Sequence, residues 1–398
     1  MTNIPGEQYL LKKSLPIIMT KGKGIYLFDS QGHKYLDMTA TAWTMNLGYG
    51  NRKVLKATIN QLKKLSHCRT HYYTDVKLQL GKKISELSPI PNGRVDFCLH
   101  GSAANEGALK IALNKHKGRS NVLYLEDGFH GRTFATMAVS WKHHNKKLRS
   151  FYGPNIEVKK DLKDIENKMK KYRPAAFIVE LIQGNGGQNI LDKKLVLGIR
   201  KLCTKYKVAL IVDEIQTGFG RCGCFFLSVE YGIIPDIITF GKAVSNGVPL
   251  FGLIAGPGYD YETDDHSFTY AHCPLGMASA LATIKQLTPK LFEECLEKGK
   301  YMEEKIRGLN QTYPVFGTIK QWGLMFGVDI VDLAGKPNIP LAEAIVEKMF
   351  EKRVIMNLSK CKGMGYTLKF KPALIITYRE LDRVFVLLEE TLRELLKK

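Results

Sequence analysis

PDIITFGKAVSNGVP (235–249) places a single lysine, Lys242, where an apolar run ends and a loop containing glycine begins. The run DIITF (236–240) has the β-branched and apolar composition of a buried strand. Four earlier runs share this composition: RVDFCL (94–99), NVLYLE (121–126), AAFIVELI (175–182) and VALIVDEI (208–215). They alternate with amphipathic segments, which is the pattern of a mostly parallel sheet covered by helices. The sequence therefore predicts an α/β fold.

The two ends of the chain have a different pattern from its middle. GIYLFDSQGHKYLDM (24–38) predicts two short strands around a turn at 29–32. Long amphipathic segments follow Leu281, with a strand-rich piece between them. We expect both ends to form one smaller α+β domain, with residues 1–50 and 286–398 on either side of a large domain at 51–285.

Composition excludes several classes of protein. The net charge of +21 comes mostly from lysines spread over amphipathic segments, without an arginine-rich arm, so we expect no nucleic-acid partner. No signal-peptide pattern and no long apolar span are present, which predicts a cytoplasmic protein without a membrane partner. The eight cysteines include no C-x-x-C pair and no Cys/His set at zinc spacing, so no metal site is predicted.

Polar residues follow the predicted strands at the edge where ligands bind in such sheets. Gly101 and Ser102 open a helix, where backbone N–H groups and a hydroxyl suit a phosphate, although many turns look like this for geometric reasons. Phe129 can stack on a planar ring or simply pack in its loop. Asp213 ends a central strand and requires a partner, which a structural salt bridge could equally supply. Lys242 can form a Schiff base with an aldehyde.

Together these groups supply what pyridoxal phosphate requires. They offer a phosphate anchor, a stacking ring, a carboxylate for the pyridine nitrogen and an amine that forms an imine. The combination, rather than any single residue, points to this cofactor.

The chain resembles the class III aminotransferases of the ornithine and acetylornithine type, which depend on pyridoxal phosphate and have fold type I. The resemblance extends from the predicted hairpin at 24–38 to KPALIIT (371–377). It rests on motifs in the family's order: GSAANEGALK (101–110), FHGRT (129–133), VELIQG (179–184), VDEIQTGFGR (212–221), PDIITFGKA (235–243) and SFTYAHCPLG (267–276).

The resemblance implies roles for the cofactor contacts. Lys242 would form the Schiff base and shuttle protons, and Asp213 would contact the pyridine nitrogen. Gln216 would contact the phenolic oxygen of the ring, and Phe129 would stack on the ring. Gly101, Ser102 and Ala103 match the segment that holds the phosphate, although Ala103 replaces a common glutamate.

The resemblance also implies substrate and subunit contacts. Thr269 matches a threonine that reaches the phosphate of a neighbouring subunit, which implies a homodimer with composite active sites. Arg132, Trp43 and Phe268 match positions that contact or line the substrate pocket. Glu180 and Arg221 match family positions to which we assign structural support.

The chain departs from the family where the substrate carboxylate is held. Lys369, in LKFKPAL (368–374), takes the place of an arginine, and Asn185 takes the place of the glutamate that pairs with it in ornithine-type enzymes. Lysine lacks the bidentate fork of arginine. Either the substrate differs from the ornithine type, with a bulkier and less polar pocket, or Lys369 still holds a carboxylate as a point charge.

Three classes of function follow from these observations. The favoured one is a ping-pong transfer of an amino group from an amine or amino acid to a keto or aldehyde acceptor, in amino acid or secondary metabolite biosynthesis. The second is an aminomutase or racemase on the same fold, because FGKAVSNGVP (240–249) also resembles the lysine segment of glutamate-1-semialdehyde aminomutases. The third is a basic binding protein without catalysis.

Overall fold

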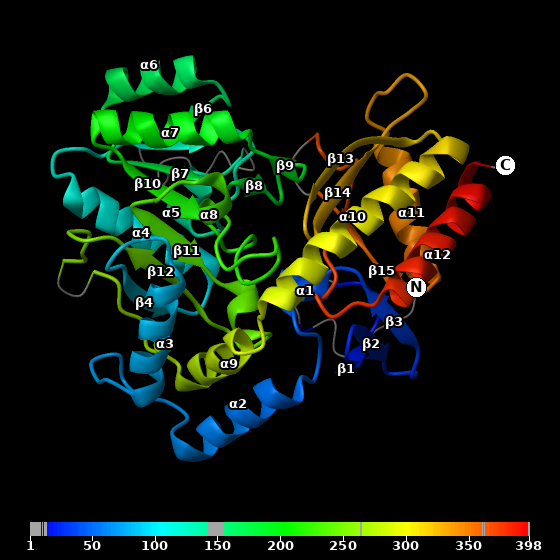
Figure 1. Ribbon diagram of the computed structural model, residues 1–398, viewed down its shortest axis with the longest axis horizontal. Helices are drawn as coiled ribbons and strands as arrows, with labels where there is room; N and C mark the ends of the chain where they lie inside the picture. The colour runs from blue at the N-terminus through cyan, green and yellow to red at the C-terminus, as the bar shows by residue number, and fades with distance from the viewer. Residues whose placement is uncertain are drawn as a thin grey trace.

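The computed structural model describes residues 9, 11, 14–141, 155–262, 265–359, 361 and 363–396. Its largest element is a seven-stranded sheet in the order β4-β12-β11-β10-β7-β5-β6 (Figure 1). Adjacent strands from β11 to β6 are parallel, and β12 is antiparallel to both of its neighbours. The strands are β4 (Arg94–Cys98), β5 (Val122–Leu125), β6 (Asn155–Val158), β7 (Ala176–Val179), β10 (Ala209–Asp213), β11 (Ile237–Phe240) and β12 (Phe251–Ala255). The prediction of a mostly parallel α/β sheet is confirmed.

Alternation along the strands explains why both faces of this sheet are covered. Leu210 and Val212 of β10 pack in one core with Ile165 of α6 (Leu162–Tyr172) and Ile199 of α7 (Lys193–Tyr206). Their neighbours on the strand, such as Ile211, pack in another core with α4 (Gly101–Lys115). Because successive side chains point to opposite faces, a strand between two helical layers is apolar at every position.

The two ends of the chain meet in smaller sheets. Strands β1 (Met19–Lys23), β2 (Tyr26–Asp29) and β3 (Lys34–Asp37) are antiparallel, and β15 (Val354–Ile355) pairs in parallel with β3. A second sheet, built from C-terminal strands, has the order β13-β14-β17-β16. A third sheet, from the middle of the chain, consists of β8 and β9. Their bounds are β8 (Ile182–Gln183), β9 (Asn189–Ile190), β13 (Phe316–Trp322), β14 (Met325–Ile330), β16 (Asn357–Leu358) and β17 (Thr367–Phe370).

Some of the remaining helices lie around the large sheet and others lie around the smaller sheets (Figure 1). The bounds of these helices, η3 being a 3-10 helix, are α1 (Ala40–Trp43), α2 (Arg52–Lys64), α3 (Asp75–Leu87), α5 (Phe134–Ala138), α8 (Ser228–Tyr231), η3 (Lys242–Ser245), α9 (Pro274–Ile284), α10 (Pro289–Thr312), α11 (Ile339–Glu351) and α12 (Tyr378–Leu396). The long helices α10, α11 and α12 lie beside the smaller sheets (Figure 1). Within the described ranges, no helix combines the length and apolar character needed to cross a bilayer.

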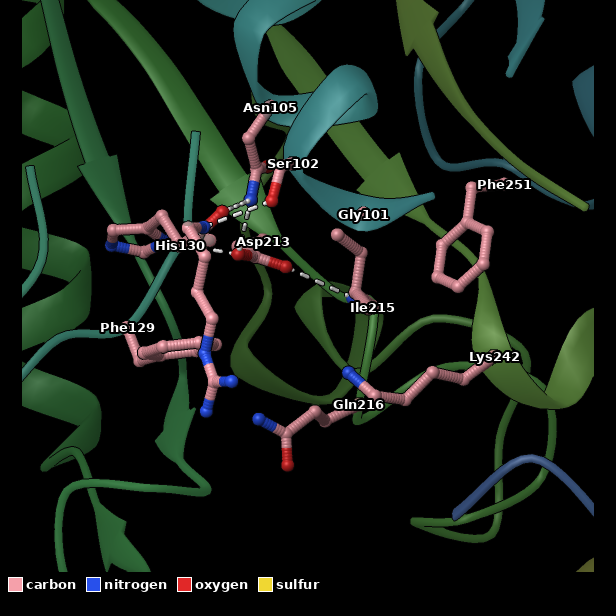
Figure 2. Close-up of a pocket in the computed structure, with 12 residues that line it drawn as sticks. Gly101, Ser102, Asn105, Phe129, His130, Asp213, Ile215, Gln216, Lys242 and Phe251 are labelled. Carbon is pink, nitrogen blue, oxygen red and sulfur yellow. Dashed lines mark hydrogen bonds and ion pairs between the residues drawn. The ribbon is translucent and has the colours of Figure 1, made fainter. Parts of the chain in front are cut away.

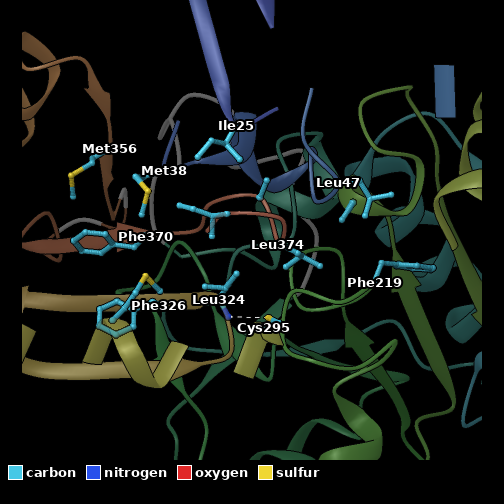
Figure 3. Packing of buried hydrophobic residues seen from close by; sticks show 14 of the residues in the cluster. Ile25, Met38, Leu47, Phe219, Cys295, Leu324, Phe326, Met356, Phe370 and Leu374 are labelled. Atoms are coloured by element: carbon cyan, nitrogen blue, oxygen red, sulfur yellow. Dashed lines mark hydrogen bonds between the residues drawn. The ribbon is translucent and has the colours of Figure 1, made fainter. Parts of the chain in front are cut away.

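One core joins the terminal segments to the large sheet. Ile25 and Met38 from the N-terminal part, Phe370 and Leu374 from the C-terminal part, and Phe219 from the middle belong to the same buried cluster (Figure 3). The terminal segments therefore pack together and against the middle of the chain. The domain boundaries at residues 50 and 285 stay a prediction, because this core includes residues on both sides of each.

Candidate active site

The predicted cofactor residues meet in a cavity of about 260 Å3. It lies beyond the carboxyl ends of β4, β10 and β11, where the loops after parallel strands converge. Figure 2 shows the side chains around it. Six of the predicted residues line it: Gly101, Ser102, Phe129, Asp213, Gln216 and Lys242, and Arg132 lines its exposed side.

Asp213 is held by donors from three elements. Its Oδ2 accepts hydrogen bonds from Asn105 Nδ2 at 2.8 Å and from His130 Nδ1 at 2.9 Å, and its Oδ1 accepts one from the backbone N–H of Ile215 at 3.1 Å (Figure 2). Asn105 is itself oriented by Thr239, whose hydroxyl donates to its Oδ1 at 2.7 Å. Burial with this full set of partners fixes the carboxylate in one position.

Asn105 and His130 were assigned no role from the sequence. Asn105 follows Ser102 by three residues, so it lies one helical turn further along α4, and His130 is adjacent to Phe129. Their position inside two recognised motifs was the available signal. Their contact with Asp213 spans 108 and 83 residues of chain and becomes visible only in the fold.

Lys242 begins the short helix that follows β11, with a backbone φ of +46°. The left-handed region is unfavourable for a residue with a Cβ, and such strain is concentrated at functional sites. Gly241 precedes it, and a Cβ there would lie 1.8 Å from the ring of Phe251. Burial lowers the pKa of Lys242 to about 8. The carboxylates of Asp213 and Glu180 raise this pKa, but the effect of burial is larger. The lowered pKa increases the neutral, nucleophilic fraction of the amine.

The start of α4 forms the opposite wall of the cavity. The side chain of His100 caps the helix by accepting from Ala103 N at 3.1 Å, and Ser102 Oγ accepts from Arg132 N at 3.0 Å. Gly101 and Ser102 line the cavity, where they can hold an anion at the helix start. Ala103 is buried against Ile215 and its N–H already has His100 as partner, so its predicted contact with the cofactor stays a prediction.

Glu180 positions two of the cavity residues. Its Oε2 accepts from the backbone N–H of Phe129 at 2.9 Å, and its Oε1 accepts from Gln216 Nε2 at 3.4 Å. Burial raises the pKa of Glu180 to about 7. Gln216 Oε1 is buried without a hydrogen-bond partner in the described residues, which leaves it available to a ligand.

Trp43 lies near Lys242 and Lys369, and the predicted contact of Trp43 and Lys369 with the substrate stays a prediction. The Nζ atoms of Lys242 and Lys369 are 5.5 and 5.1 Å from the centre of the Trp43 ring. Lys369 Nζ also donates to the carbonyl of Gly184 at 3.5 Å, next to Asn185. A third amine at this ring, Lys371, was not recognised from the sequence.

Phe268 and Thr269 do not line this cavity. Both are exposed, and the ring of Phe268 contacts that of His266. A residue that reaches the site of a neighbouring subunit must lie on the surface of its own chain. Their predicted contacts therefore stay predictions about a dimer.

Arg221 is buried and does not line the cavity. Its Nη atoms donate to the carbonyl oxygens of Leu324 and Pro372 and to the side chain of Asn46, at distances of 3.1, 2.5 and 2.5 Å. It joins three distant segments, which is the structural support expected of it.

Comparison with known proteins identifies the class to which this arrangement belongs. The family model "Aminotransferase class-III" matches residues 10–392. The acetylornithine aminotransferases of Methanocaldococcus jannaschii and Caldanaerobacter subterraneus are each 32% identical to the chain, and each alignment covers 96% of this chain and 95% of the relative. The chain belongs to the class III aminotransferase family.

Solved structures agree with this assignment. A transaminase from the marine bacterium Virgibacillus superposes with a TM-score of 0.90 at 24% identity, covering 100% of this chain and 97% of the other. The ornithine aminotransferase of Toxoplasma gondii gives 0.88 at 25% identity, with 98% and 94% coverage. The predictions of the fold, of an aminotransferase and of pyridoxal phosphate as its cofactor are confirmed. The comparisons give no support to an aminomutase, a racemase or a non-catalytic protein.

Proposed function

We propose that the chain transfers an amino group from an amine or amino acid to a keto or aldehyde acceptor in two half-reactions, using the cavity between α4 and Lys242. The observation that supports the proposal is that Ser102, Asp213 and Lys242, the residue types that pyridoxal phosphate requires, line one cavity. Bound there, the cofactor supplies an aldehyde carbon and an electron-withdrawing pyridine ring.

The protein side of the reaction follows from the positions of these residues. Lys242 would provide the buried amine that holds the cofactor's aldehyde carbon, and its Nζ would carry a proton to and from the reacting carbon of the substrate. The carboxylate of Asp213, fixed by Asn105 and His130, faces the cavity as the partner of the pyridine nitrogen. Gly101 and Ser102 hold the phosphate at the start of α4.

The chain's own groups also determine which substrates fit. Arg132 lies at the exposed side of the cavity, where it can attract a carboxylate. Trp43 presents an apolar face beside the reacting amine. We expect a substrate that is less polar than ornithine and carries an anionic group. Ornithine or acetylornithine as the best donor by a wide margin would contradict this expectation.

Absorption spectroscopy of the protein with pyridoxal phosphate tests the function. The wild type is expected to show a cofactor band that depends on Lys242, lose it with one amine donor alone, and regain it when a keto acid is added. Lys242→Ala should lack the band and lose at least about a thousandfold in turnover. Lys168→Met, which removes an equal charge from outer helix α6, should behave as the wild type. Absence of a band that depends on Lys242 would contradict the proposal.

The proposed assembly is a homodimer with composite sites. Thr269 and Phe268 are exposed, as is the adjacent Tyr270. Exposed aromatic side chains gathered on one surface are typical of an interface. Light scattering should give twice the mass of the chain, and Thr269→Ala should weaken the affinity for pyridoxal phosphate without dissociating the dimer.

The proposed location is the cytoplasm. The cysteines of the described residues form no disulfide, which is usual in a reducing compartment. Fractionation of the source cells tests it.

A further inference from the structure

Lys371 is a buried amine that the proposed reaction does not use. It follows β17 and is 1% exposed, and its backbone N–H donates to the carbonyl of Met38 at 2.8 Å. Its Nζ has no hydrogen-bond partner in the described part of the chain. Its Nζ lies instead 4.2 Å from the centre of the Trp43 ring. A lysine almost never occupies such a position without a partner.

Lys369 and Lys371 point to the same place for a simple reason. In extended chain, residues two apart lie on the same face, so a K-x-K pair at the end of a strand projects two amines together. Both Nζ atoms lie within 5.1 Å of the centre of the same indole ring. Lys242 Nζ lies 5.5 Å from the centre of that ring as well, so three amines share one indole.

The surroundings of Lys371 are rich in positive charge. Burial and the positive charges of Lys369, Arg221 and Lys242 hold the pKa of Lys371 well below its usual value, and Glu180 opposes them. The carboxylate of Glu180 does not bond to Lys371 Nζ, which has no hydrogen-bond partner in the described residues. An attraction to the face of an indole only partly offsets the loss of water around a buried ammonium.

Trp43 supplies a second unpartnered donor at the same place. It is 8% exposed, and its indole Nε1–H has no hydrogen-bond partner in the described ranges. Buried indole N–H groups usually find an acceptor. The ring is presented by four consecutive residues, Ala40–Trp43, with positive φ angles between 42° and 70°. These strained backbone angles place the Trp43 side chain beside the two lysines.

We propose that Lys369 and Lys371 together bind one compact anionic group of the substrate, a carboxylate or a phosphonate-type group, with each ammonium taking a separate oxygen. The two amines then replace the two parallel donors of a guanidinium fork. This inference rests on the proposed function, because it names the group by which that site recognises its substrate. Lys369 is therefore one half of the anion site, and Lys371 is the specificity-determining residue that completes it.

The test uses the protein loaded with pyridoxal phosphate and unreactive probes of similar size: butyrate, propylphosphonate and neutral butanamide. Both anions should perturb the absorption of the bound cofactor in the wild type, and butanamide should not. Lys371→Met should weaken the binding of the anions by about ten- to a hundredfold, the usual range for a hydrogen bond to a charged group. Lys168→Met controls for the loss of one positive charge. The anion that binds more tightly identifies the class of substrate.

Two further measurements separate this role from a structural one. At a pH below the ordinary pKa of lysine, the wild type should take up a proton as the anion binds, because the anion favours the charged form of Lys371, and Lys371→Met should not. The double variant Lys369→Arg with Lys371→Met should recover the binding of butyrate, because one guanidinium again offers two donors to one carboxylate.

Several outcomes would overturn the inference. These are wild-type anion affinity in Lys371→Met, equal proton uptake in both proteins, or no recovery in the double variant.

The thermal stability of the variant is a further test. Without ligand, Lys371→Met should melt at a higher temperature than the wild type, because it removes an unpaired buried amine. A less stable or unfolded variant would contradict the unpaired state of Lys371. Failure of the proposed function is distinguishable, since it would abolish the band that depends on Lys242 in the wild type.

Discussion

The cofactor cavity and the surroundings of Trp43, which Lys242 joins, are built on opposite principles. At the cofactor side, both oxygens of Asp213 already have donors from the chain, supplied by Asn105, His130 and the backbone. At the side of Trp43, Lys371 and the indole N–H have no hydrogen-bond partner in the described structure. A paired group is fixed before any ligand arrives, whereas an unpaired buried donor gains its partner from the ligand. The contrast indicates a preformed cofactor site and a substrate site that the substrate completes.

The largest expected effect tests the preformed side. Asp213→Asn keeps the size of the side chain but removes the negative charge that faces the pyridine nitrogen. Turnover should fall by about a hundred- to a thousandfold, the range for losing one electrostatic contact to the reacting system. The free energy of unfolding should also fall, by about 1–3 kcal/mol, because the buried side chain loses an accepted hydrogen bond. Steady-state rates and thermal unfolding of the same preparation measure both effects.

Glu214, the next residue, is the matched control. Its carboxylate accepts from Thr217 Oγ1 at 2.9 Å and from the backbone N–H groups of Leu227 and Ser228 at 2.6 and 2.9 Å, and it does not line the cavity. Glu214→Gln should lower the free energy of unfolding by about 1–3 kcal/mol, while the folded fraction keeps its turnover. Equal losses of turnover in both variants would show that the two acids are not divided into a catalytic and a structural one.

The sequence predicted the preformed side well because its signals are local. Apolar runs set the strands of the sheet, and polar residues directly after those runs, such as Ser102, Asp213 and Lys242, must meet at one edge. The sequence did not predict that His130 and Asn105 hold Asp213, because that contact depends on how α4 and the loop that contains His130 pack against the end of β10. Side-chain partners across distant segments leave no periodic pattern.

The substrate side was predicted less completely for a different reason. Trp43 and Lys369 were recognised by resemblance, but nothing in the sequence distinguishes Lys371 from the many other lysines of the chain. Its burial follows from pairing between β14 and β17 and from the backbone bond to Met38, which joins the two ends of the chain. Neither the left-handed turn at Ala40–Trp43 nor this long-range contact follows from local propensity, which disfavours such a turn.

An intermediate effect is expected where that turn is anchored. Asp37 accepts hydrogen bonds at Oδ1 from the backbone N–H and hydroxyl of Thr39, at 2.8 and 2.6 Å, and at Oδ2 from the N–H of Thr41 at 2.9 Å. Asp37→Asn loses the charge and one acceptor, so the unfolding free energy should fall by about 2 kcal/mol. Because Trp43 is then held less firmly, KM for the amino substrate should rise while the cofactor band persists. An unchanged KM would show that the strained turn does not position the substrate side.

The smallest effect concerns Glu180, which holds Phe129 and Gln216 at the cofactor side. Burial raises its pKa from 4.5 to about 7, so the folded chain retains a proton that the unfolded chain has lost over this interval. Its contribution to stability is complete below pH 4.5 and is lost as the pH rises through 7. Between pH 6 and pH 7 the cofactor-free wild type should therefore lose about 1 kcal/mol relative to Glu180→Gln, measured by urea unfolding. Parallel stability curves would mean that Glu180 is already ionised in the folded chain, and that the preformed side carries one more negative charge to balance the lysines around Trp43.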